Sequence, residues 1–249
     1  MGSPSDRPLA GKTALITGAG SGIGRAAVLA YAEAGASLSI CGRRRALLEE
    51  TAVAARAYGV PVRVYALDVA DPDAVAAWVG DARDAFGRID VLLNCAGTNA
   101  RQRTWANTTI DSWDELIATN LKGVFLTTRA VLPTMREQHD GLIINVSSIA
   151  GVQASLVSGV AYSASKFGVV SLTQSLNLEE WHNGIRASAV CPGEVATPIM
   201  DKRPNPPPEH AHALMIQPED MGATLVFLAT LPPRVVVEQV LIRPTVRQY

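Results

Sequence analysis

The sequence is poor in cysteine and in charge. Only three of its 249 residues are cysteines (Cys41, Cys95 and Cys191), and they form no C-x-x-C pair. An odd number of scattered cysteines does not make a disulfide framework, so we expect reduced thiols in a cytoplasmic protein. Charged residues make up 18% of the chain, and the net charge is −1. The chain therefore has no basic field for nucleic acid or for an acidic membrane, and neither partner is expected.

Signals for export and for membrane insertion are also lacking. The first residues, MGSPSDRPLAGK, contain no basic region followed by an apolar core, so no signal peptide is predicted. Residues 141–165 have no charged side chain, but they include several serines, an asparagine and a glutamine. A membrane span needs about 20 mainly apolar residues. The stretch is therefore interpreted as a buried strand followed by a segment that faces something enclosed.

Short apolar runs alternate with amphipathic stretches along the whole chain. The runs predict strands, and the stretches between most of them have helical spacing. Continuous apolar strands are typical of parallel sheets covered on both faces. We predict one α/β domain over residues 1–249, a Rossmann-like doubly wound parallel sheet. The expected strands are 12–17, 37–41, 62–67, 89–97, 142–146, 185–191 and 235–242, and the expected helices are 24–36, 44–59, 71–87, 111–137, 160–182 and 218–230.

A glycine-rich turn, TGAGSGIG, joins the first strand to the first helix. Gly18, Gly22 and Gly24 have the spacing G-x-x-x-G-x-G, which differs from the G-x-G-x-x-G pattern of many dinucleotide-binding turns. Glycines at such a turn allow a close approach of the backbone to a pyrophosphate, and the following helix offers unpaired N–H groups to the anion. The alternative is a plain strand-to-helix turn with no ligand. The position of the glycines directly after the first strand favours a dinucleotide site.

The end of the second predicted strand indicates which nicotinamide cofactor is bound. An acidic residue there accepts hydrogen bonds from ribose hydroxyls, whereas an arginine pairs with a 2′-phosphate. Here the sequence is CGRRR, with Gly42 where an acid often stands and Arg43, Arg44 and Arg45 after it. A cationic cluster at the start of a helix opposes the helix dipole, so a solvated helix start explains it less well than a phosphate does. We predict NADP(H), with NAD(H) the less favoured cofactor.

Tyr162 and Lys166 are four residues apart in the stretch AYSASKFG, on one face of a predicted helix. A nearby ammonium favours the phenolate and lowers a tyrosine pKa, which suits acid–base chemistry. An ordinary surface pair is the alternative. Small residues around Tyr162 leave room for a ligand, and the serine-bearing strand end INVSSIAG lies just upstream.

The ordered motifs of the chain resemble those of the short-chain dehydrogenase/reductase family over essentially its full length. The turn TGAGSGIG, the segment LDV, the NCAG motif with Cys95 for the second asparagine, TNLKGVF, SSIAG, YSASK and CPGEVATP occur in the family's order. The resemblance implies an NAD(P)-dependent oxidoreductase that interconverts a secondary alcohol and a ketone or aldehyde, with no metal. It also implies a homodimer or homotetramer.

The resemblance implies four catalytic residues. Tyr162 is the general acid/base, and Lys166 lowers its pKa and binds the nicotinamide ribose. Ser148 holds the substrate oxygen; it is preferred to Ser147 because it directly precedes IAG. Asn120 anchors a water that links Lys166 to solvent.

The implied cofactor contacts follow the same motifs. Asp68 would accept from the adenine amino group, and Asn94 has a competing structural role in tying strands together. Besides Tyr162 and Lys166, the expected cofactor-binding residues are Gly18, Ser21, Gly22, Ile23, Gly24, Arg43, Asp68, Val69, Asn94, Ala96, Gly97, Pro192, Gly193, Val195 and Thr197.

Other features bear on the substrate, a small molecule with a carbonyl or alcohol group. The ending VLIRPTVRQY is similar to an NADP-preferring branch of 3-hydroxy-acid and serine dehydrogenases. Ser148 and Tyr162 are 14 positions apart, one more than expected for the family, so a bulge is predicted between them. The pocket is expected from residues 98–106, residues 152–160 and a lid at about 198–215.

Several residues and activities remain as alternatives. Arg101 and Arg103 could hold a substrate carboxylate or be ordinary solvated arginines. His210 and His212 are interpreted as solvated loop residues, because no third metal ligand accompanies them. The rival activities are those of a nucleotide-sugar epimerase or dehydratase and of a non-catalytic NADP-binding regulator.

Overall fold

Seven parallel strands form a single sheet in the computed structural model, which describes residues 7–246. The order across the sheet is β3-β2-β1-β4-β5-β6-β7, as in doubly wound folds. The predicted Rossmann-like α/β class is therefore confirmed. The strands are β1 (Thr13–Thr17), β2 (Ser37–Gly42), β3 (Val62–Ala66), β4 (Val91–Asn94), β5 (Gly141–Val146), β6 (Ile185–Pro192) and β7 (Gln239–Ile242).

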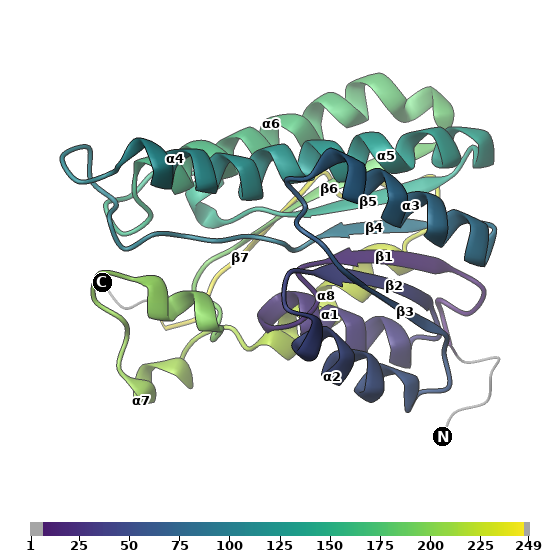
Figure 1. The fold of residues 1–249 in the computed structure, drawn as a ribbon, viewed down its shortest axis with the longest axis horizontal. Helices are drawn as coiled ribbons and strands as arrows, with labels where there is room; N and C mark the ends of the chain where they lie inside the picture. Colours follow the sequence, from purple (N-terminus) through teal and green to yellow (C-terminus); the bar gives the residue numbers. More distant parts are fainter. Residues whose placement is uncertain (1–6, 247–249) are drawn as a thin grey trace.

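Helices cover both faces of this sheet (Figure 1). On one side lie α1 (Gly22–Glu33), α2 (Arg45–Arg56) and α8 (Pro218–Thr230), and on the other lie α3 (Pro72–Phe86), α4 (Ile110–Ile117), α5 (Gly123–Gln138) and α6 (Val160–Glu180). Shorter helical turns are Ala118–Lys122 (a π-helix), Ile149–Gly151, Trp181–Asn183, Pro198–Lys202 and α7 (Glu209–His212).

Alternating side chains of the strands build a core on each face, as the period of two requires. In β1, Leu15 packs toward the side of Trp78 on α3, whereas Ile16 packs toward Tyr31 on α1. Both aromatic side chains are fully buried. Their polar ends are satisfied: Trp78 donates to Ser39 Oγ at 2.8 Å, and Tyr31 donates to the Leu225 carbonyl at 3.0 Å. The sheet is thus a rigid support for the loops at its carboxyl end.

Three predicted elements differ clearly from the structure. The strand expected over 89–97 is only Val91–Asn94. The helix expected over 111–137 is interrupted by the π-helix at Ala118–Lys122, which contains Asn120. Apolar periodicity does not reveal a single wide turn, because one extra residue hardly changes the pattern. The strand expected over 235–242 begins only at Gln239, since only residues 239–242 pair with β6 at the sheet edge.

β1 and β4 are neighbours in the sheet, and the connections that leave their carboxyl ends run to opposite faces. Ligands of such sheets bind in the crevice at this switch point. The predicted lid, residues 198–215, lies beside it. In Figure 1 the segment with α7 extends away from the two helix layers. Its own apolar cluster is small, with Met200, Ala211 and Met215 at its centre.

None of the helices within residues 7–246 is both long and apolar enough to span a bilayer.

Candidate active site

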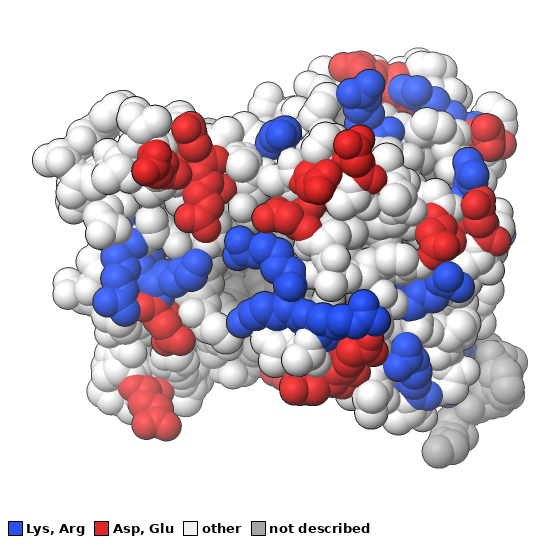
Figure 2. All heavy atoms as spheres, in the orientation of Figure 1, with Lys and Arg blue, Asp and Glu red and all other residues white. Residues whose placement is uncertain are grey.

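A cavity of about 1150 Å³ opens at the carboxyl end of the sheet. Its walls come from the turn after β1, the ends of β2 and β3, the loops after β4 and β5, the start of α6 and the stretch after β6. Figure 2 shows Lys and Arg side chains bordering the hollow at the centre of this face. Most of the predicted site residues line this cavity. The exceptions among them are Asn94 and Asn120.

The glycine turn between β1 and α1 forms one end of the cavity. Gly18 and Gly22 have positive φ values of 65° and 54°, which favour glycine. A Cβ on Gly24 would lie 2.3 Å from the Gly18 carbonyl oxygen, so only glycine fits there. Ser21 begins α1 without a capping hydrogen bond from its side chain. The first N–H groups of α1 therefore have no side-chain cap and can receive an anion.

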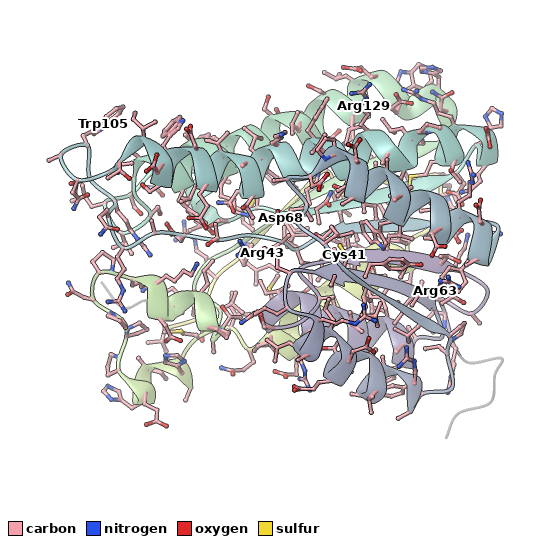
Figure 3. All side chains as sticks on the ribbon, viewed as in Figure 1. Cys41, Arg43, Arg63, Asp68, Trp105 and Arg129 are labelled. Carbon is pink, nitrogen blue, oxygen red and sulfur yellow. The ribbon has the colours of Figure 1, made fainter. Side chains whose placement is uncertain are left out.

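Two arginines, rather than one, border the cavity at the end of β2. Arg43, labelled in Figure 3, and Arg44 both line it, and Arg44 also donates to Ser21 Oγ at 3.0 Å. Arg45 lies outside the cavity lining and pairs with Glu49 at 3.2 Å. The sequence singled out Arg43 alone, because a run of three arginines does not show which ones turn inward.

Asp68 and Val69 follow β3 and line the cavity; Asp68 is labelled in Figure 3. The Asp68 carboxylate accepts from the Ala70 backbone N–H at 3.0 Å, which fixes its orientation. After β4, Ala96 and Gly97 also line the cavity. Beyond β6, Pro192, Gly193, Val195 and Thr197 also line the cavity.

The structure does not bring Asn94 to the cavity. Its side chain is buried, donates to Asn145 Oδ1 at 2.9 Å and accepts from Thr127 Oγ1 at 2.7 Å. Asn145 in turn donates to Thr173 at 2.9 Å. This chain of bonds joins β4 and β5 to α5 and α6. Of the two roles considered for Asn94, the structure displays the structural one.

Tyr162, Lys166 and Ser148 all line the cavity. The Lys166 ammonium lies 5.6 Å from the centre of the Tyr162 ring and donates to the Val146 carbonyl at 2.8 Å. Ser148 begins a short helical turn and accepts from the Ala150 N–H at 3.1 Å. Ser147 also borders the cavity, but its hydroxyl donates to the Lys166 carbonyl at 2.9 Å. Ser148 is thus the serine whose hydroxyl remains available beside Tyr162.

The protonation of Tyr162 is governed by burial. Enclosure by protein raises the pKa of the phenol above 10, whereas Ser148, Arg103 and Arg203 act in the opposite direction. Desolvation is the largest of these effects. That Lys166 lowers the pKa of Tyr162 stays a prediction. Burial also lowers the pKa of Lys166 itself from 10.5 to about 8, against small opposing effects of Cys95 and Cys191.

Asn120 lies in the π-helix, behind the cavity wall. Its fully buried side chain accepts from the Thr98 N–H at 2.8 Å and donates to the Thr98 carbonyl at 3.0 Å. It also donates to Ser165 Oγ at 3.2 Å. Asn120 therefore fixes the loop after β4 against α6 one residue before Lys166. The wide turn that presents it is a common device at functional sites.

The segment between Ser148 and Tyr162 forms part of the cavity wall. Gln153, Ser155, Val157 and Ser158 line the cavity, and Leu156 is 92% exposed. Gly159 ends the segment with a φ of 82°. The predicted bulge is thus an irregular loop between the turn at Ile149–Gly151 and α6.

Sequence reasoning missed the environment of Arg103. Its side chain is only 6% exposed and donates to three backbone carbonyls, so it is neither solvated nor free to grip a substrate with its whole guanidinium group. Arg101 is exposed, which agrees with its interpretation as an ordinary solvated arginine. His210 and His212 lie on α7, and residues 7–246 contain no cluster of three or more metal-ligating side chains.

The chain is similar to a known family of proteins. The family model for short chain dehydrogenase matches residues 12–207. The chain belongs to the short-chain dehydrogenase family.

Individual relatives of this family are similar over most of the chain. A Streptomyces virginiae protein, named as a candidate ketoacyl reductase of monensin polyketide synthase, is 45% identical over 193 residues, which cover 77% of this chain and 73% of the relative. The 3-oxoacyl-(acyl-carrier-protein) reductase of Thermotoga maritima is 37% identical over 89% of this chain and 92% of its own. The crystal structure of a metagenomic short-chain oxidoreductase in complex with NADP has a TM-score of 0.83 at 32% identity and covers 96% of this chain and 100% of that one. The chain is thus a dehydrogenase/reductase of this family.

Proposed function

We propose that the protein is an NADP(H)-dependent oxidoreductase that interconverts a secondary alcohol and a ketone or aldehyde. One observation carries the proposal: Tyr162, Ser148 and Lys166 share a single cavity with the glycine turn and with Arg43 and Arg44. A dinucleotide site and an acid–base pair in one enclosure are what hydride transfer to a carbonyl requires.

The residues of the cavity fit an NADP(H) molecule. The glycine turn and the uncapped start of α1 suit a pyrophosphate, and Arg43 and Arg44 suit a 2′-phosphate. Asp68 and Val69 would hold the adenine, and the stretch from Pro192 to Thr197 would hold the nicotinamide end. The NADP in the crystal structure of the metagenomic relative supports this choice of cofactor. The bound cofactor would supply or accept the hydride.

The proton of the reaction would be handled by Tyr162. Because burial keeps its pKa above 10, the phenol is protonated at neutral pH and can donate to a carbonyl oxygen during reduction. The Ser148 hydroxyl would donate a second hydrogen bond to that oxygen and hold it in place. Lys166, with a pKa of about 8, would bind the ribose hydroxyls through its remaining N–H groups. Asn120 would fix the loop beside this lysine and anchor a water that links the lysine to solvent.

The cellular setting is part of the same proposal. We infer a cytoplasmic enzyme that acts on a small molecule and assembles as a homodimer or homotetramer. Exposed apolar side chains, including Phe125, Phe167 and Leu178 on α5 and α6, support self-association.

The proposal is tested with a panel of ketones, aldehydes and alcohols, by following NADPH absorbance. We expect turnover of at least one compound, and we expect Tyr162→Phe to lower kcat by about 100-fold or more. NADPH affinity should be unchanged in this variant. Tight NADPH binding without turnover on any compound would instead support a non-catalytic regulator.

A further inference from the structure

Arg103 connects three segments that are far apart in the sequence. Its Nε donates to the Ala100 carbonyl at 2.7 Å, its Nη1 to the Val157 carbonyl, and its Nη2 to the Lys202 carbonyl at 2.9 Å. These carbonyls belong to the loop after β4, to the segment before α6 and to the lid. The three segments are the walls around the side of the cavity where Tyr162 lies.

The backbone of Arg103 adds a fourth attachment. Its carbonyl accepts from the N–H of Val160, the first residue of α6, at 3.1 Å. Arg103 therefore holds the chain on both sides of Gly159, three residues before Tyr162. The fit is tight, because a Cβ on Gly159 would lie 2.5 Å from the Cβ of Arg103.

The apolar cluster of the lid is small, so polar contacts do much of the fastening. Besides the bond from Arg103, Lys202 Nζ donates to Thr98 Oγ1 at 2.6 Å, and Arg203 pairs with Glu194 at 2.7 Å. At the other end of the lid, Gln217 donates to the His212 and Met215 carbonyls at 2.9 and 3.0 Å. Because the other two walls meet at Arg103 as well, its guanidinium is the point where all three are joined.

Arg103 and the proposed acid–base residue Tyr162 line the same cavity, and the positive charge of Arg103 acts to lower the pKa of the phenol. Among the described residues no carboxylate pairs with this buried cation. Its neighbours in charge are Arg203, which repels it, and Tyr162. The groups acting on Tyr162 are Ser148, Arg103, Arg203 and, on its own helix, Lys166; Glu194 offsets part of the charge of Arg203.

We propose that Arg103 is a positioning residue, which joins the three walls of the substrate side through its planar guanidinium and places its positive charge at the cavity that Tyr162 lines. Lysine cannot replace it, because an ammonium on a flexible stem lacks the planar fork of donors that reaches these three carbonyls. The proposal rests on the proposed function for its kinetic consequences, but its structural part does not.

Two variants separate the geometry from the charge. Arg103→Lys keeps the charge and loses the three-way joint, whereas Arg103→Gln loses both. Arg101→Gln is the matched control, since Arg101 is exposed and makes only a 3.5 Å contact with the Asp201 carbonyl.

Hydrogen–deuterium exchange of the protein without ligand tests the joint. We expect faster amide exchange in the lid peptides 198–206 and in 153–159 for both Arg103 variants, and wild-type exchange for Arg101→Gln. This measurement requires no substrate, so its failure is distinguishable from failure of the proposed function. If Arg103→Gln does not fold, Arg103→Lys alone decides: wild-type exchange in that variant would overturn the proposal.

Kinetics with an accepted alcohol test the charge. We expect both Arg103 variants to raise KM for the alcohol by about tenfold while KM for NADP changes less than about twofold, because a misplaced wall affects substrate binding first. In the oxidation direction the inflection of kcat/KM should move to higher pH in Arg103→Gln, because a lost cation no longer favours the phenolate. Arg103→Lys should restore the wild-type inflection. A folded Arg103→Gln with wild-type exchange and wild-type inflection contradicts the proposal.

Discussion

The ammonium of Lys166 lies 5.6 Å from the centre of the Tyr162 ring, one helical turn away on α6. The lysine is nearly fully buried, and its nearest hydrogen-bond acceptor is the Val146 carbonyl at 2.8 Å. Burial of a cation without a carboxylate partner is costly, and it lowers the pKa of Lys166 to about 8. Such a costly arrangement suits a group that binds a ligand better than one that stabilises the fold.

Lys166→Met should therefore stabilise the protein without ligand. At pH 7 the buried charge is removed, and we expect the free energy of unfolding to rise by about 1–2 kcal/mol. Between pH 8 and 10.5 the unfolded chain binds more protons at Lys166 than the folded protein does, so wild-type stability increases with pH relative to the variant. The advantage of the variant should shrink across this window. Urea denaturation at pH 7 and pH 9.5 measures it, and Lys122→Met, at the exposed last residue of the π-helix, is the control.

The three arginines after β2 should contribute unequally to NADPH binding. Arg43→Ala and Arg44→Ala should each weaken NADPH binding by about tenfold or more, because each loses a charge-assisted contact with the 2′-phosphate. NADH binding should change little. Arg45→Ala, which loses only the pair with Glu49, should leave both affinities unchanged. Fluorescence titration of each variant with both cofactors checks this. An equal loss of NADPH affinity in Arg45→Ala would contradict the assignment of Arg43 and Arg44 to the 2′-phosphate.

The two neighbouring serines should have different effects. Ser148→Ala should lower kcat by about 100-fold, since it removes a donor to the substrate oxygen. Ser147→Ala should instead lower stability by about 1 kcal/mol, because the Lys166 carbonyl loses its hydrogen bond. Steady-state kinetics and thermal unfolding of both variants test the division. The reverse assignment would follow if Ser147→Ala lost activity and Ser148→Ala did not.

Sequence reasoning was most reliable where a local pattern fixes the structure. The apolar runs predicted the seven strands, and the glycine spacing and the Tyr162–Lys166 spacing placed these residues at one cavity. Long-range contacts could not be predicted from the sequence. Nothing in the sequence near Arg103 shows that Val157 and Lys202 approach it, and the π-helix at Asn120 hardly disturbs the helical period. The burial that raises the pKa of Tyr162 was missed for a related reason: burial depends on the whole fold, whereas the spacing to Lys166 is local.

Transfer of deuterium tests the central claim most directly. NADPH carrying deuterium at the reactive nicotinamide carbon is incubated with the enzyme and an accepted ketone, and the alcohol is examined by mass spectrometry. The account predicts one deuterium on the carbinol carbon of each product molecule, at a rate that falls by about 100-fold or more in Tyr162→Phe. A product without deuterium, or an unchanged rate in Tyr162→Phe, would contradict it.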